Sequence, residues 1–320
     1  MTPRQALSNL HIEKTFCNMS KYLDPKADLT FKKIFGEHPD LVISFLNALL
    51  PLDEDSQIES VEYLPAQQVP RTPARKDSIV DVKCTDQNKR QFIVEMQMSW
   101  SEEFKQRVVF NTAKAYVGQL DKGEDYELLQ PVYSLNLVND TFENDVEDFY
   151  HYYRLVHDRY SNKVIEGLHL VFVELPKFKP QTIADRRMMV LWLRFLTEIN
   201  EKTEKVPEEL MADEHVRCAL ELVEESAYTR AEMEGYDKFW DLVSREKTMM
   251  NEARRQRAKG LKEGLEKGRT EGRAEGRAEG RAEGITEGIL KIAGNMKRSG
   301  VPIASIMQLT GLSEEEIRDL

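Results

Sequence analysis

Cysteine and long apolar runs are both scarce in this sequence, and their scarcity excludes several classes of protein. The 320 residues include three cysteines, none in the paired spacing of a zinc knuckle or a disulfide framework. No apolar run approaches the roughly 18 to 20 residues that span a bilayer, and the N-terminal residues lack the apolar core of a signal peptide. We therefore expect a cytoplasmic protein without a membrane segment, whose free thiols Cys17, Cys84 and Cys218 are mostly buried.

Positive charge is also in deficit. Lysine and arginine total 45 against 56 acidic residues, which leaves a formal net charge of -11. This balance argues against a globally basic nucleic-acid binder, although a local basic patch can still bind phosphates. The length is ample for a hydrophobic core, and the charged residues cluster late in the chain. We expect a core domain with charged appendages.

Changes of pattern along the chain suggest five segments. Residues 1–18 show little pattern and are expected to be a disordered extension or a mis-assigned start, because the stretch from Met19 resembles a natural beginning. The other predicted segments are an α/β domain over 19–180, an acidic helical accessory region over 181–250, a glycine-periodic charged linker or long helix over 251–294, and a small helix-turn-helix-like C-terminal segment over 295–320.

Hydrophobic periodicity predicts a mixed α/β order in the first half of the chain. A three-to-four-residue apolar spacing predicts helices over 28–35, 41–50 and 101–120. Alternating or continuous apolar runs predict strands over 57–64, 79–84, 92–98, 131–138, 149–156 and 168–174. This order is typical of an α/β or α+β sandwich built on a mixed sheet.

The tail has a pattern of its own, with a glycine at every fourth residue from Gly260 to Gly288. Each glycine costs a helix about 1 kcal/mol relative to alanine, and like charges at i,i+4 repel, so an isolated helix here would be weak. Residues 251–300 hold 13 lysines and arginines against 8 glutamates, which suits a solvated face or a contact with phosphates. We expect a partly helical linker or an oligomerising arm. The last twenty residues resemble the end of a helix-turn-helix, and pairing with another chain is equally open.

Two apolar runs, 79–84 and 92–98, each hold an acid at the centre, Asp81 and Glu95. In a hairpin, strand alternation puts Asp81 on the face opposite Val80, and puts Glu95 on the face opposite its apolar neighbours. If the apolar faces point into the core, both acids are expected to lie together outside it.

The loop between the two runs sets their register. With a loop over roughly 85–91, residue i lies opposite residue 176 minus i, so that Asp81 faces Glu95 with β-carbons about 5 Å apart. Such a pair repels unless one carboxyl is protonated or a cation lies between them. Carboxylate oxygens suit hard Mg²⁺ or Mn²⁺, so the spacing predicts a divalent-metal site. The alternative is two ordinary solvent-facing acids on a hairpin.

Several motifs around this pair occur in the order of a known family. The stretches "DLTFKKIFG", "RKDSIVDVK", "FIVEMQ", "FKQRVVFNTAKAYVGQL" and "YELLQPVYSLNLV" resemble the recombination-promoting nuclease and transposase family of the PD-(D/E)XK nuclease superfamily. The resemblance runs from about Asp28 to Leu175. It implies a restriction-endonuclease-like core, a mixed sheet flanked by helices, and a Mg²⁺- or Mn²⁺-dependent activity on DNA.

The resemblance also assigns roles to individual residues. Asp81 and Glu95 are expected to hold the metal, and Asp28 to be an accessory acid, although Asp28 is equally placed to cap a helix. Gln97 stands where the superfamily usually has a lysine, and a neutral amide can position water but supplies no charge. The residues expected to supply that charge or to bind the substrate are Lys32, Arg75, Lys76, Lys83 and Arg107.

Two functions follow from these expectations. The first is a metal-dependent DNA endonuclease acting in recombination, transposition or defence against mobile elements and phage. The second is a nuclease-derived protein whose site has lapsed, and which binds DNA or oligomerises through its tail. The acid pair separates the two, because only the nuclease requires it.

Overall fold

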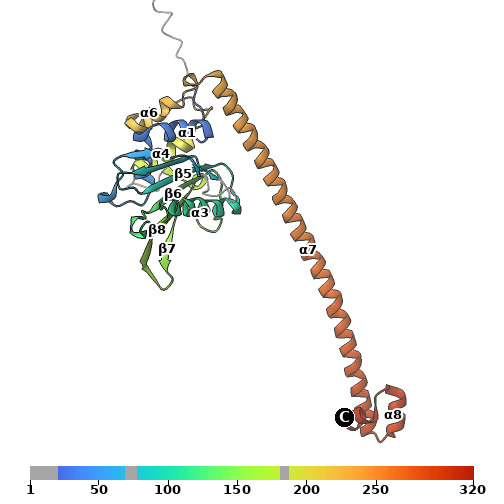
Figure 1. Cartoon of the computed structure of the whole chain (residues 1–320). Helices are drawn as coiled ribbons and strands as arrows, with labels where there is room; N and C mark the ends of the chain where they lie inside the picture. Colours follow the sequence, from blue (N-terminus) through green and yellow to red (C-terminus); the bar gives the residue numbers. More distant parts are fainter. Residues whose placement is uncertain (1–20, 69–77, 181–186) are drawn as a thin grey trace, which may run out of the picture. The chain divides into compact units, whose positions relative to one another are not determined.

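The computed structural model describes residues 21–68, 78–180 and 187–320 (Figure 1). The chain forms two compact units, one up to Lys247 and one from Thr248 to Leu320. In the described residues no helix is long and apolar enough to cross a membrane. The predicted positions Cys17, Arg75 and Lys76 lie outside the described residues.

The first unit is built on a six-stranded mixed sheet with the strand order β1-β4-β5-β6-β8-β7. Its strands are β1 (Val61–Tyr63), β4 (Val82–Asp86), β5 (Gln91–Gln97), β6 (Val132–Val138), β7 (Tyr150–His157) and β8 (Tyr160–Glu174). Strands β5, β6 and β8 run parallel, while β1–β4, β4–β5 and β7–β8 are antiparallel pairs. Strands β2 (Gln67–Gln68) and β3 (Ser78–Ile79) form a separate pair. The mixed sheet confirms the predicted α/β class.

Helices cover both faces of this sheet (Figure 1). One layer holds α1 (Asp28–Glu37), α2 (Pro39–Leu49), α4 (Arg187–Glu198), α5 (Glu208–Ala212) and α6 (Glu214–Leu222). The other face is covered by α3 (Glu102–Val117), whose apolar residues pack on β5, β6 and β8. Short turns of 3-10 helix lie at Glu54–Ser56, Tyr126–Leu128, Leu175–Lys177 and Glu225–Ala227. Ser101 caps α3 as its sequence predicts, because its hydroxyl accepts the Phe104 N–H.

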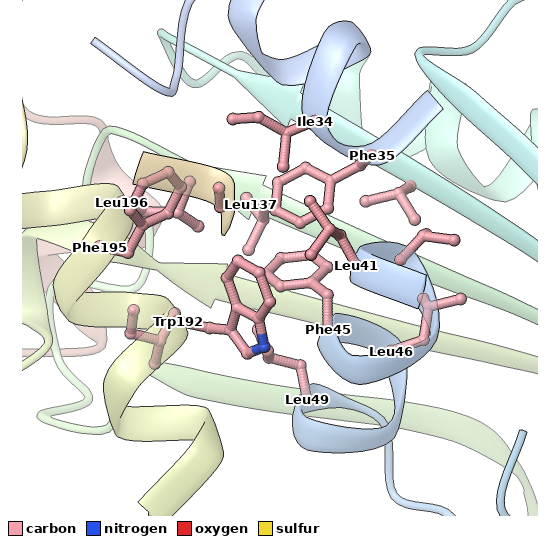
Figure 2. Packing of buried hydrophobic residues seen from close by; sticks show 14 of the residues in the cluster. Ile34, Phe35, Leu41, Phe45, Leu46, Leu49, Leu137, Trp192, Phe195 and Leu196 are labelled. Atoms are coloured by element: carbon pink, nitrogen blue, oxygen red, sulfur yellow. The ribbon is translucent and has the colours of Figure 1, made fainter. Parts of the chain in front are cut away.

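The main hydrophobic core lies between the sheet and the first helical layer, as Figure 2 shows. The rings of Phe35 and Phe45 stack with centroids 4.3 Å apart, and Trp192 meets both rings from α4. All three side chains are fully buried. Helices α4 and α6, which belong to the region expected as an accessory lobe, share this core with the sheet. Cys84 lies in it as a free thiol, and burial raises its pKa to about 12.

The glycine-periodic tail belongs to one continuous helix, α7 (Arg230–Arg298), so of the two alternatives predicted for residues 251–294 the structure has the long helix. Pairs at i,i+4 such as Lys259–Glu263, with Nζ 3.8 Å from Oε1, line its exposed surface. Its end packs against α8 (Ile303–Thr310) and α9 (Glu314–Arg318) through Ala293, Ile306 and Ile317. Gly311 takes a left-handed φ of 74° at the turn between the last two helices, as a C-terminal cap requires.

Candidate active site

Strands β4 and β5 pair in the register that their loop length predicts. Val82 lies opposite Val94 and Lys83 opposite Ile93, which confirms the pairing of residue i with 176 minus i. Asp81 lies in a bend just before β4, where the ladder has ended. Its Oδ2 accepts a hydrogen bond from the Met96 N–H at 2.8 Å. The Asp81 carboxylate thus accepts the N–H of a β5 residue, Met96, that lies beyond the end of the β4–β5 ladder.

The bend at Asp81 corrects one part of the sequence interpretation. A continuous strand over 79–84 was predicted, with Val80 and Val82 on the same face, and that prediction is wrong. Val80 packs with Ile93 beneath α3, while Val82 points into the main core. The irregular backbone between β3 and β4 breaks the alternation, so both faces of the sheet receive an apolar side chain from this segment.

Glu95 is buried, so the prediction that both acids lie outside the protein core is also wrong. The residue is only 4% exposed, because α3 covers the face of β5 that the sequence pattern left open. Asn111 of α3 donates its Nδ2–H to Glu95 Oε1 at 3.0 Å. The Nη2 of Arg107 lies 3.6 Å from Oε2 of the same carboxylate. The helix therefore holds both oxygens of Glu95.

Burial dominates the electrostatics of the pair. Loss of solvent raises the pKa of Asp81, against the lowering effects of the Met96 N–H and of the Lys32 and Arg107 charges. Loss of solvent likewise raises the pKa of Glu95, which the Asn111 hydrogen bond and Arg107 lower and the Asp81 charge raises further. Two carboxylates in such a place favour a proton or a cation between them.

Gln97 and Arg107 meet beside the acids. Arg107 Nη2 donates to Gln97 Oε1 at 2.9 Å, and Gln97 Nε2 donates to the Ser99 carbonyl at 2.8 Å. The guanidinium also lies over the Phe104 ring, with its carbon 4.9 Å from the centroid. The positively charged guanidinium of Arg107 is therefore hydrogen-bonded to the neutral amide of Gln97, which occupies the position where the superfamily usually has a lysine.

Asp28 and Lys32 approach the pair from α1. Lys32 Nζ lies 2.6 Å from Asp28 Oδ1, and both side chains are nearly half exposed. The N-cap of α1 is Ala27, so the alternative role of Asp28 as a helix cap is wrong. Asp28 occupies the first turn instead, where a negative charge interacts favourably with the helix dipole. Both side chains are close enough to influence the pKa of Asp81.

Lys83 lies on β4, two residues after Asp81 and opposite Ile93, on the side that α3 covers. Burial lowers the pKa of the Lys83 ammonium, and the charge of Lys114 on α3 lowers it further. Of the residues predicted for the site, the structure thus brings Asp81 and Glu95 together, with Gln97 and Arg107 beside Glu95. Asp28, Lys32 and Lys83 lie around this group.

The sequence analysis missed Asn111. A signal for it exists, because Asn111 stands three residues after Val108 and four before Ala115, both on the buried side of α3. An uncharged polar residue in an apolar stripe indicates a buried hydrogen bond.

The oxygen ligands that Asp81 and Glu95 offer determine which metal ion this pair could bind. In residues 21–68, 78–180 and 187–320 no group of three or more His, Cys, Asp or Glu side chains could hold a metal ion. Mg²⁺ is commonly bound by one or two carboxylates, with waters and phosphate oxygens completing its shell. Asp81 and Glu95 supply two carboxylates, of which Glu95 is buried and Asp81 partly buried, so this pair fits a small hard cation.

The fold and the acid pair together define a class, the restriction-endonuclease-like α/β proteins with a mixed sheet between helices. Residues 25–253 match the family described as PD-(D/E)XK nuclease family transposase. Residues 286–320 match the Rpn/YhgA-like nuclease family, C-terminal HTH domain. Because the first match covers more than half of the chain, the protein belongs to the PD-(D/E)XK nuclease family transposases, which confirms the predicted resemblance. No curated protein and no solved structure gave a match.

Proposed function

We propose that this protein is a metal-dependent DNA endonuclease that hydrolyses phosphodiester bonds in recombination, transposition or defence against mobile elements. The observation that carries the proposal is the acid pair. The β4–β5 register brings Asp81 and Glu95 together, and α3 buries Glu95. Membership of a nuclease family supports the same reaction class.

Asp81 and Glu95 would hold the metal, Mg²⁺ or Mn²⁺. When bound, such an ion lowers the pKa of its water and neutralises charge on the phosphate. The Met96 N–H fixes the Asp81 carboxylate, and Asn111 with Arg107 fixes Glu95. These contacts restrain the oxygens of both acids before the substrate arrives.

Gln97 and Arg107 together replace the lysine that the superfamily usually has at this position. The Gln97 amide, whose Oε1 is held by Arg107, orients the attacking water, and the guanidinium stabilises negative charge. Asp28 is assigned the role of accessory acid beside the metal site, as its influence on Asp81 allows.

DNA is the proposed partner. Lys32 and Lys83 lie around the acids and are assigned to the phosphate backbone, as are Arg75 and Lys76 from the sequence alone. The match of residues 286–320 to a helix-turn-helix domain supports DNA as the substrate, and a DNA substrate suits the cytoplasm. A homo-oligomer formed through the tail remains part of the proposal, because α7 has exposed apolar residues such as Leu261 and Leu265.

A second function is a binding protein whose nuclease site has lapsed. Two observations favour it, namely a glutamine at the lysine position and, among the described residues, no group of three or more metal-ligating side chains. Such a protein would bind DNA through the basic residues and the C-terminal unit without cutting it.

Nicking of a supercoiled plasmid tests the proposal. We expect the wild type to nick in Mg²⁺ or Mn²⁺, to stop in EDTA, and to lose nicking in Asp81→Ala. Cleavage at full rate in Asp81→Ala would refute the site assignment. If the folded wild type binds DNA in a salt-dependent way but does not cut it in the presence of any divalent metal, the second function, a lapsed nuclease site, would be favoured.

A further inference from the structure

Asn111 is a buried residue that contacts the acid pair, and the sequence predicts no role for it. It lies on α3 with 1% of its surface exposed, and its Nδ2 lies 3.0 Å from Glu95 Oε1. A buried amide that touches a buried carboxylate is poised to set the orientation of that carboxylate.

The chemistry of the pair determines which end of the amide faces Glu95. An ionised carboxylate only accepts hydrogen bonds, so the NH₂ group must face it and the carbonyl oxygen must point elsewhere. That oxygen, Oδ1, is buried and has no hydrogen-bond partner in the described part of the chain. Buried polar atoms are almost always hydrogen-bonded, so an unpaired Oδ1 beside the acids suits a donor that enters with the contents of the site.

We propose that Asn111 is a positioning residue for the metal site, an inference that rests on the proposed function. Its amide nitrogen fixes the Glu95 carboxylate, and its amide oxygen accepts a hydrogen bond from a water of that site. Residues that hold metal ligands in this way commonly change metal affinity by about 10- to 100-fold when removed.

The experiment measures Mn²⁺ binding by calorimetry on the full chain, with Asn111→Leu as the variant, because leucine keeps the volume and removes both polar atoms. Thr112→Val is the matched control. Thr112 is the next residue of α3, is fully buried, and donates its hydroxyl only to its own helix at the Val108 carbonyl, 2.7 Å away.

We expect Asn111→Leu to weaken Mn²⁺ binding about 10- to 100-fold and Thr112→Val to leave it unchanged. At saturating Mn²⁺, plasmid nicking by Asn111→Leu should show a lowered kcat with an unchanged KM, because the water loses its acceptor. Asn111→Ala repeats both measurements in case the leucine variant does not fold.

Wild-type Mn²⁺ affinity in both folded Asn111 variants would overturn the inference and leave the proposed function intact. Recovery of the full wild-type kcat at saturating metal would overturn the role of the amide oxygen. A wild type that binds no Mn²⁺ would overturn the proposed function, and this inference with it.

Discussion

Two glutamates of this protein lie in opposite surroundings, one in each unit. Glu95 is buried beneath α3, and loss of solvent raises its pKa. Glu316 lies exposed at the start of α9, where its Oε2 accepts the Ser313 N–H at 2.8 Å and the Ser313 hydroxyl at 2.7 Å. Those bonds lower the pKa of Glu316.

Glu316 has a structural role at a helix end, whereas Glu95 has a catalytic role only under the proposed function. The capping box at Ser313 stabilises a helix end with a carboxylate that remains in solvent. Glu95 stabilises nothing comparable, because a buried charge without a full counter-ion opposes folding. The two hydrogen-bonding residues on α3 hold its oxygens without removing that penalty. Under the proposed function, a metal cation is the partner of this buried acid.

Glu95→Gln removes the charge of the buried acid and has the largest expected effect. The amide keeps the shape and removes the charge that the metal requires, so plasmid nicking in Mg²⁺ should fall on the order of 10³-fold. Glu102→Gln, at an exposed position in the first turn of α3, is the control and should nick normally. Full activity in a folded Glu95→Gln would remove Glu95 from the site.

Arg107→Ala should have the next largest effect, about a 100-fold loss of nicking. The variant removes the charge beside Gln97 and Glu95, and stabilisation by such a donor is of this order. Arg107→Lys should recover only part of the rate, because a point charge does not reproduce the planar guanidinium.

The control for Arg107 is Lys105→Ala, two residues earlier on α3, where the ammonium pairs with Glu143 at 3.4 Å. It removes the same charge from the same helix. Equal rates for the two alanine variants would show that only general attraction to DNA had been lost.

Most of the sheet could be predicted from the sequence, because strand patterns are local. The predicted strands over 131–138 and 149–156 correspond to β6 and β7, which lie within one residue of those bounds. The β4–β5 register followed from loop length alone. The closeness of Asp81 to Glu95 could therefore be predicted from the sequence.

The surroundings of the acids could not be predicted, because they depend on which helix covers which face. Nothing near Glu95 in sequence shows that α3 returns over it, and burial changed its expected state. The bend at Asp81 is another tertiary effect, since it lets one side chain accept the N–H of Met96. The pairing of Arg107 with Gln97 likewise joins residues ten positions apart on different elements.

Asp81→Asn tests how much the charge of Asp81 destabilises the metal-free protein. A carboxyl whose pKa is raised by folding contributes stability below its unfolded pKa and loses it as the pH rises through the folded value. The asparagine variant should therefore melt higher at pH 8, by roughly 2 to 4 °C, and the gain should vanish below about pH 4. Calorimetric melts across this range check it, and a lower melting temperature at pH 8 would contradict it.

Ser313→Ala tests the exposed acid and has the smallest expected effect. Loss of the cap should speed amide hydrogen exchange in α9, for example at Ile317, by roughly fivefold, and leave DNA nicking unchanged. Ser299→Ala, at an exposed position just after α7, should alter neither. Exchange at Ile317 that does not change in Ser313→Ala would show that the capping box contributes nothing.

The central claim is that Asp81 and Glu95 destabilise the metal-free protein and that a bound cation removes this cost. The most direct test is the melting temperature of wild type and Asp81→Asn, measured at pH 8 as Mn²⁺ is added. Without metal, the asparagine variant should be the more stable protein. As Mn²⁺ rises, binding to the folded state should raise the wild-type melting temperature, and the order of the two proteins should reverse. A wild-type melting temperature that does not respond to Mn²⁺, or a variant that rises equally, would contradict the account.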